Sequence, residues 1–398
     1  MKYNIKTKHR FMYNNTNKLS IVLFGGGLQV LSTARSLREK GYTVDVMGTH
    51  NEISKRCRYV EKCIHIDIEK LELEQFISYI KEGKYGVIIP MEDDYATWLS
   101  KHKEEVEKST SAKCAVMDYD VYALASDKTQ MMAFCKKHGI PHPNTEIIDN
   151  NFEELVETVG FPSLIKPSHS AGSRGIKLVN NVDELKQFSK EIIAEYGEST
   201  LQEYICSKDY YFNAMLYRTA DGRYGNHTIT KIMRYYPIKG GSSSFCMSIE
   251  NERILEICQK TLDKLGWVGF ADFDILEKGD GDYRIIEINP RIPASVQAAA
   301  ASGVHFGEMI VRDITEGVLT QYTYTPGMQL RCLGLDIAWF LASPNRWKCK
   351  PSWFKFFGKK LHYQDGGSKD FLAMCTSIWM GIKKQMNPEF RKKKKGMN

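Results

Sequence analysis

One segment, residues 266–291, constrains this chain more than any other; it reads GWVGFADFDILEKGDGDYRIIEINPR. Residues 270–276 alternate apolar and polar side chains, as in a strand with one buried face. The glycines of residues 278–282 favour a turn, and residues 283–288 return to β-branched and aromatic side chains. The segment therefore predicts a β-hairpin.

Acidic and amide side chains recur along both predicted strands, and side chains on a strand alternate between its two faces. Asp272 and Asp274 therefore share one face of the first strand. Glu287 and Asn289 likewise share one face of the second, so two strands present oxygen atoms to one point. Carboxylate and amide oxygens without His or Cys suit a hard cation such as Mg²⁺, or Mn²⁺. Arg291 adds a planar cation for phosphate oxygens, which the alternative of a solvated hairpin with outward acids does not explain.

Length and composition bound the class of protein. The 398 residues fit two or three globular domains. The ten cysteines are scattered without a CxxC pair, and the sequence shows neither a signal peptide nor an apolar run of membrane-spanning length. We therefore expect reduced thiols and a cytoplasmic protein. The net charge of +7 is modest, and much of it lies in residues 6–10 and 391–395.

The N-terminal part predicts a small doubly wound α/β domain at residues 19–118, after a flexible arm at residues 1–18. A buried-type strand, a glycine turn at residues 25–27, a helix and a second strand open it. A dinucleotide site is an alternative, but Val30 occupies the place of the third glycine in GxGxxG. The MEDD run at residues 91–94 follows a strand, where α/β crevices bind ligands, although acids that cap a helix explain it equally well.

A long loop interrupts the next predicted hairpin. A strand carrying Lys166 enters residues 167–175, a loop of Ser, His and Gly, before a second strand begins. Exposed backbone N–H groups and small hydroxyls are what a polyphosphate needs, with Lys166 and Arg174 adding charge. Hairpin loops usually have about two to five residues, so this length indicates function, with a merely mobile surface loop as the alternative. No GK[ST] follows the glycines, so this is not a Walker A loop.

With these pieces in order, the chain resembles ATP-grasp enzymes over residues 19–325. The most specific part of the resemblance is the acid-bearing strand followed by IIEINPR. In that family the first acid precedes the glutamate by about twelve or thirteen residues, which favours Asp274 over Asp272 as its counterpart. The resemblance implies that Asp274, Glu287 and Asn289 hold magnesium.

Other functional positions carry over from the same resemblance. Arg291 would face the γ-phosphate or an acyl phosphate. Apart from the resemblance, Lys231 and Arg234 lie on a predicted basic strand and are further candidate catalytic residues. Lys128 and Lys166 resemble the two lysines that contact the nucleotide phosphates and adenine. The lid over the phosphates would contribute Ser168, Ser170, Gly172, Ser173 and Gly175, and the hinge that binds adenine and ribose would contribute Glu203, Tyr204, Ile205 and Asp209.

The expected architecture is mixed, α/β followed by α+β. The resemblance implies a pre-ATP-grasp domain at residues 19–118, which would help to bind the acceptor substrate. An ATP-grasp domain at residues 119–325 would follow, and then a C-terminal extension at residues 326–398 with a basic tail.

The resemblance implies an ATP-dependent carboxylate–amine ligase of the EC 6.3 class, which forms a carbon–nitrogen bond through an acyl phosphate. ATP and Mg²⁺ would be its cofactors, and a small acid and amine, such as an amino acid or a sugar acid, its substrates. A homodimer would be unsurprising. Two alternatives stay open: a bicarbonate-using carboxylase or carbamoyl phosphate synthetase-like enzyme, and a nucleotide-binding module without turnover.

The C-terminal extension is aromatic and basic and ends in RKKKK at residues 391–395. We expect this end to be solvated, with attraction to an anionic membrane surface as the less favoured alternative. Basic residues that alternate with aromatic ones also occur in RNA-binding proteins, but no nucleic-acid module is recognisable, so we expect no nucleic-acid partner.

Overall fold

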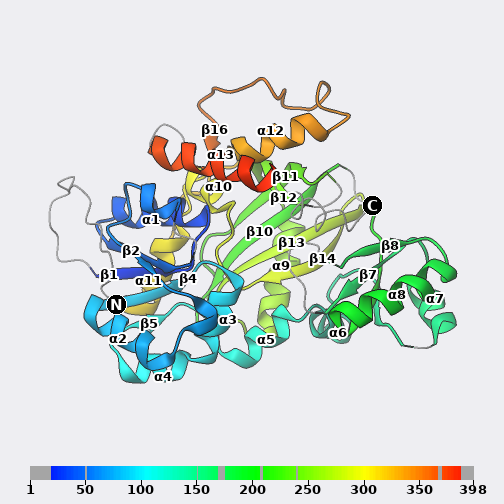
Figure 1. Cartoon of the computed structure of the whole chain (residues 1–398), viewed down its shortest axis with the longest axis horizontal. Coiled ribbons are helices and arrows are strands. Elements are labelled where there is room, and N and C mark those ends of the chain that lie inside the picture. Colours follow the sequence, from blue (N-terminus) through cyan, green and yellow to red (C-terminus); the bar gives the residue numbers. More distant parts are fainter. Residues whose placement is uncertain are drawn as a thin grey trace.

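The computed structural model arranges the chain into three β-sheets flanked by helices (Figure 1). A parallel N-terminal sheet is followed by an antiparallel sheet and then by a larger, mainly antiparallel one, which confirms the expected mixed α/β fold class. The structure describes residues 19–49, 52–149, 151–168, 175–206, 209–238, 241–365 and 370–386.

The first sheet is parallel and has the strand order β3-β2-β1-β4-β5. Its elements are β1 (Ser20–Phe24), α1 (Gln29–Glu39), β2 (Thr43–Gly48), η1 (Ser54–Arg56), β3 (Cys63–His65), η2 (Ile68–Lys70), α2 (Leu73–Gly83), β4 (Tyr85–Pro90), α3 (Asp93–Lys101), α4 (Lys103–Ser109) and β5 (Lys113–Cys114). The central strand is buried along residues 21–24, as expected when helices cover both faces of a parallel sheet. After β1 the chain turns at Gly25 and Gly27, whose φ angles of 115° and 91° favour glycine.

The second sheet is antiparallel, with the order β6-β9-β7-β8. Its elements are β6 (Thr145–Ile147), α7 (Phe152–Val159), β7 (Ser163–Pro167), β8 (Lys177–Val179), α8 (Val182–Tyr196) and β9 (Ser199–Glu203), and α5 (Tyr119–Ser126) and α6 (Lys128–His138) precede it. The Asp127 side chain accepts a hydrogen bond from the backbone N–H of Gln130 and caps α6. This cap fixes Lys128 as the first residue of the helix.

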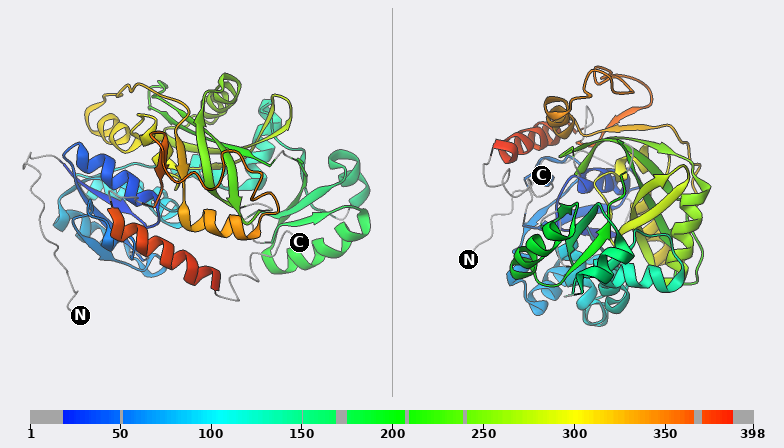
Figure 2. Two further views of the ribbon diagram at one scale, coloured as in Figure 1. Left: turned by 90° about the horizontal axis from the view of Figure 1, so that it is seen from above. Right: turned by 90° about the vertical axis from the view of Figure 1, so that its right-hand side faces the viewer.

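The third sheet has seven strands in the order β14-β13-β10-β11-β12-β15-β16. They are β10 (Tyr211–Arg218), β11 (Thr228–Tyr236), β12 (Ser242–Ile249), β13 (Gly269–Gly279), β14 (Asp282–Asn289), β15 (Gln329–Arg331) and β16 (Leu361–Tyr363), with helices α9 (Glu252–Leu265), α10 (Val296–Ala301), α11 (Phe306–Glu316), α12 (Leu333–Ala342) and α13 (Phe371–Met386). Strands β13 and β14 form the hairpin that the sequence predicts. Figures 1 and 2 show α12 and α13 together along one side of the molecule.

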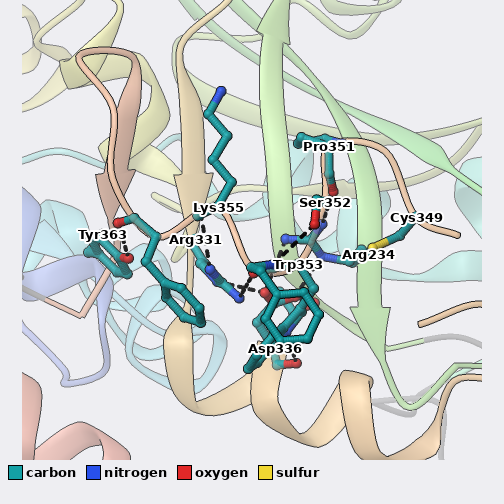
Figure 3. Close-up of polar contacts among 12 residues, drawn as sticks. Arg234, Arg331, Asp336, Cys349, Pro351, Ser352, Trp353, Lys355 and Tyr363 are labelled. Atoms are coloured by element: carbon teal, nitrogen blue, oxygen red, sulfur yellow. Dashed lines mark hydrogen bonds and ion pairs between the residues drawn. The ribbon is translucent and has the colours of Figure 1, made fainter. Parts of the chain in front are cut away.

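A buried ion-pair cluster ties α12 to the third sheet (Figure 3). The Asp336 carboxylate lies 2.7 Å from Arg234 Nε and 2.7 Å from Arg331 Nε, and all three side chains are at most 2% exposed. Arg234 lies on β11, Arg331 on β15 and Asp336 on α12. Because one carboxylate neutralises two arginines from separate strands, losing it would leave two buried positive charges.

We therefore expect Asp336→Ala to lower the free energy of unfolding by about 3–5 kcal/mol, the cost of breaking a buried ion pair. Urea unfolding followed by circular dichroism measures this. The matched control is Asp282→Asn, which removes a partly exposed partner of Arg284 and should cost less than about 1 kcal/mol. Equal losses in the two variants would contradict a structural role for the cluster.

Candidate functional site

The carboxylates of the hairpin face one another across β13 and β14. In the antiparallel register Asp274 pairs with Glu287, and Asp272 pairs with Asn289. Paired residues of antiparallel strands lie on the same face of the sheet. The neighbouring residues of β13, such as Phe273, point to the opposite face and pack in the core against α9. The site is thus the face of the hairpin that α9 does not cover.

The carboxylates on this face are buried and lie close to one another, and both effects disfavour their negatively charged forms. Asp272 is 2% exposed, and burial together with the nearby Asp274 carboxylate raises its pKa well above the usual value. Burial and the Glu287 carboxylate raise the pKa of Asp274 to about 6. A divalent cation beside these groups would stabilise their charged forms, so the donor set fits Mg²⁺.

Amide side chains hold the carboxylates in place. Asn213 Nδ2 donates to Asp272 Oδ1 and lies 3.3 Å from Asp274 Oδ1, while Asn289 Nδ2 lies 3.4 Å from Asp274 Oδ2. Asn213 was not among the residues expected from the sequence. Its only sequence signal is a polar residue within the apolar strand β10, which by itself does not indicate a site.

Two lysines from other elements reach the same point. Lys128 Nζ, at the start of α6, lies 3.3 Å from Glu287 Oε1. Lys166, on β7, donates to Gln202 Oε1. Burial lowers the pKa of Lys166 to about 8; Glu287 opposes this shift and Lys128 adds to it. The fold therefore gathers both predicted lysines around the carboxylates of the hairpin.

Arg291 connects the site to the first sheet. Its guanidinium donates from Nε and Nη2 to the two carboxylate oxygens of Asp93, at 2.7 and 3.2 Å. Asp93 is the first residue of α3 and belongs to the MEDD run. The preceding Glu92 accepts a hydrogen bond from the backbone N–H of Gly26 at 2.7 Å. The MEDD run and the glycine turn thus lie together at one edge of the site.

Comparison with known proteins agrees with this geometry. The family model described as an ATP-grasp domain matches residues 125–295, which include both lysines and the whole hairpin. This part of the chain, 171 of its 398 residues, is therefore similar to an ATP-grasp domain.

The relatives that this chain matches are distant. It is 24% identical to D-aspartate ligase of Enterococcus faecium (strain Aus0004) over 327 residues, which cover 73% of this chain and 76% of that protein. It is 27% identical to D-alanine–D-alanine ligase of Chromohalobacter salexigens over 222 residues, covering 49% and 67%. In fold it resembles the biotin carboxylase domain of Hydrogenobacter thermophilus 2-oxoglutarate carboxylase, solved with MgADP, ADP and bicarbonate. That similarity has a TM-score of 0.65 at 16% identity and covers 78% of this chain and 74% of that one.

The expected hinge of the ATP-grasp site lies where the second sheet meets the hairpin. Glu203, at the end of β9, lies 2.5 Å from Lys278 Nζ and accepts from the backbone N–H of Asn144 at 3.2 Å. Tyr204 is exposed and Ile205 is buried. Asp209 lies farther along, where its carboxylate is 3.5 Å from Asn345 Nδ2.

Of the lid residues, Ser168 and Gly175 are described. The Ser168 hydroxyl lies 2.6 Å from Thr129 Oγ1 and 3.2 Å from Glu198 Oε1, which ties the end of β7 to α6. Gly175 has a φ of 71°. The remaining expected lid residues, Ser170, Gly172 and Ser173, lie outside the described residues.

The structure does not bring Lys231 and Arg234 to the ATP-grasp site, which corrects the expectation that they act on the reactants. Lys231 pairs with Phe212, whose side chain packs on the α9 face of the sheet, so Lys231 lies on the face opposite Asp274. Its Nζ lies 3.5 Å from the centre of the Tyr210 ring. Arg234 is committed to the buried pair with Asp336. Side-chain alternation, and the bulge that follows Ile232, decide both placements.

Among the described residues, no group of three or more His, Cys, Asp or Glu side chains is arranged as a metal site. The proposed magnesium ligands do not conflict with this, because they are two carboxylates and one amide. Mg²⁺ normally takes its remaining ligands from substrate phosphates and water.

Lys166→Met should weaken binding of Mg·ADP by roughly ten-fold or more, since it removes a charge-assisted hydrogen bond to phosphate. Lys231→Met is the matched control: it removes a lysine from the opposite face of the third sheet and should change the affinity by less than about two-fold. Isothermal titration calorimetry measures both affinities. A larger loss in Lys231→Met would contradict the placement of the site.

The affinity for Mg·ADP should also fall as the pH rises through about 8, because Lys166 loses its charge there in the free protein. Just below that pH Lys166 is protonated and adds no further change, and toward pH 6 protonation of Asp274 should lower the affinity again. Lys166→Arg keeps its charge at all these pH values and should remove the fall. A wild-type affinity that is constant to pH 9 would contradict the assignment.

Proposed function

We propose that this chain is an ATP-dependent carboxylate–amine ligase. The observation that carries the proposal is the meeting of Asp274 and Glu287 with Lys128 and Lys166, which come from three different parts of the fold. Paired carboxylates for a metal and two converging lysines suit a site that binds a nucleoside triphosphate and transfers its terminal phosphoryl group.

The reaction begins when an oxygen of the substrate carboxylate attacks the γ-phosphorus of ATP, which breaks the bond to the β-phosphate and releases ADP. The amine then attacks the acyl carbon, and inorganic phosphate leaves as the amide forms. Magnesium, held by Asp274, Glu287 and Asn289, would neutralise phosphate oxygens. Lys128 and Lys166 neutralise the charge that develops during transfer.

Arg291 has a separate task in the proposed reaction. Its guanidinium already binds a carboxylate in the bidentate manner that suits a phosphate or acyl phosphate. It therefore orients the acyl phosphate between the hairpin and α3 of the first sheet. No nucleophilic side chain of the protein is needed.

The relatives support this reaction class and favour an amino acid as one substrate. Both named relatives are ligases of amino acids, D-aspartate in one case and D-alanine in the other. Bicarbonate stays in the test as an alternative acid, because it can form the same kind of mixed anhydride with phosphate.

The test is ADP release from ATP and Mg²⁺ across a matrix of D- and L-amino acids, sugar acids, amines and bicarbonate. We expect turnover to require an acid together with an amine, and Glu287→Gln to lower kcat by at least about a hundred-fold through loss of a metal ligand. Asp282→Asn, at the start of β14 and away from Glu287, should keep normal turnover.

Two results would overturn the proposal. Turnover with bicarbonate alone, lost in Glu287→Gln, would instead identify a carboxylating enzyme. Tight binding of ATP without turnover across the whole matrix would instead favour a nucleotide-binding protein.

A further inference from the structure

The C-terminal segment displays large apolar side chains to solvent. Among the residues that the structure describes, every large apolar side chain more than half exposed lies between residues 341 and 379. Phe357 is 90% exposed, and Leu341, Trp347 and Trp379 are 67–71% exposed. Single exposed apolar residues need no explanation, but their confinement to one segment does.

The exposed residues of α13 form a stripe along one side of the helix. Phe371, Cys375 and Trp379 are spaced by four residues and are all exposed. The other side holds the helix to the body of the protein: Ala373 is buried in the core of the first sheet, and the carboxylate of Asp370 accepts from the backbone N–H of Arg58. The stripe therefore faces outward because the opposite side is the anchored one.

The segment after α12 displays its aromatic side chains from a rigid support. Arg331, of the buried cluster, donates to the backbone carbonyl of Trp353 at 2.9 Å and lies over the rings of Trp353 and Phe356 (Figure 3). On the outer side, Trp347 stacks on Phe354 with ring centres 5.8 Å apart. The outer rings are thus held in place without being buried. We name Leu341, Trp347, Phe354, Phe357, Phe371, Leu372 and Trp379 the C-terminal apolar surface.

The exposed charges that the segment itself carries among the described residues are positive, although Asp209 from another part of the chain lies 3.5 Å from Asn345. Six lysines of the same segment are exposed: Lys348, Lys350, Lys355, Lys359, Lys360 and Lys383. Its acids among the described residues are Asp336, Asp365 and Asp370, and each is at most 4% exposed; Glu389 follows later in the sequence. The sequence that follows α13 adds RKKKK at residues 391–395. The segment therefore combines exposed aromatic and aliphatic side chains with a net positive charge.

We propose that the C-terminal apolar surface docks this protein on a membrane rich in anionic lipids. Trp and Phe partition into the boundary between headgroups and acyl chains, and lysines around them attract phosphate headgroups. Within the described residues no helix is both long and apolar enough to cross a membrane, so the contact is peripheral. This proposal does not depend on the ligase reaction.

Other occupants fit the surface less well. A symmetric dimer through this face would bring the lysines of the two copies together, and the described residues of the segment offer no exposed acid to offset them. Single-stranded nucleic acid stacks on aromatic rings, but Leu341 and Leu372, which are 71% and 62% exposed, cannot stack on a base. Aliphatic and aromatic side chains exposed together favour a lipid surface.

The test is co-sedimentation of the full-length protein with large unilamellar vesicles, without nucleotide. We expect binding to vesicles with about three parts in ten phosphatidylglycerol, and at least ten-fold weaker binding to pure phosphatidylcholine. Raising the salt to about 0.5 M should weaken binding to the anionic vesicles. Trp347 and Trp379 should be quenched by lipids brominated on the acyl chain, which places their rings at the membrane.

Matched variants separate the two contributions. Phe357→Ser combined with Trp379→Ser should lower the partition coefficient at least ten-fold, whereas Ile147→Ser, at a half-exposed site on β6, should leave it unchanged. Lys348→Gln with Lys350→Gln should also lower it at least ten-fold, and Lys81→Gln with Lys108→Gln on α2 and α4 should not. Unchanged circular dichroism confirms that each variant folds.

Three outcomes would overturn the proposal. One is no binding to anionic vesicles, and another is binding that survives both surface variants. The third is a loss of self-association, or of binding to poly-uridylate RNA, in the same variants without any vesicle binding. Because no ATP is present, failure here leaves the ligase proposal untouched, and failure of the ligase assay leaves this one untouched.

Discussion

The site depends on the antiparallel pairing of β13 with β14 on one side and with β10 on the other. One face of these strands packs against α9, with Phe273 and Ile275 fully buried. The other face carries Asp274 opposite Glu287. A slip of one residue would turn the carboxylates into the apolar core and expose the core residues, so burial of one face fixes the register of both. The hydrophobic core thereby sets the geometry of the polar site.

Charge then joins parts of the chain that are far apart in sequence. Glu287 forms an ion pair with Lys128 from α6, and its carboxylate also opposes the lowering of the pKa of Lys166 on β7 by burial. Arg291 donates a hydrogen bond to Asp93 from α3, which follows the first sheet's β4. Glu287 and Arg291 thus have oppositely charged partners in other elements of the fold. In the proposed reaction, phosphate groups would compete with Asp93 for Arg291, which couples substrate binding to contact between the first and third sheets.

In the C-terminal segment, a buried ion-pair cluster supports an exposed apolar surface. Asp336 neutralises two arginines in the interior, and one of them, Arg331, supports the aromatic residues that follow α12. Breaking the buried ion pairs of this cluster would cost free energy, so the cluster holds the neighbouring backbone in place. The aromatic side chains on that backbone are exposed to water, which is unfavourable for them. On the proposal above, those side chains reach their low-energy environment at a lipid surface rather than inside the fold.

The sequence by itself determined the hairpin and its glycine turn, because these follow from local periodicity, and it indicated Lys166 on the strand that enters a long loop. Lys128 was indicated only by the resemblance to ATP-grasp enzymes. The mixed α/β fold class was likewise predictable from the order of those elements. Only the tertiary structure decided which face Lys231 occupies, because that depends on pairing with Phe212 and on a bulge in β11. It also decided that Arg234 is bound to Asp336, that Asn213 holds Asp272, and that Asp93 reaches Arg291. These contacts join residues between 59 and 198 positions apart, and no local pattern encodes the register and packing that bring such residues together.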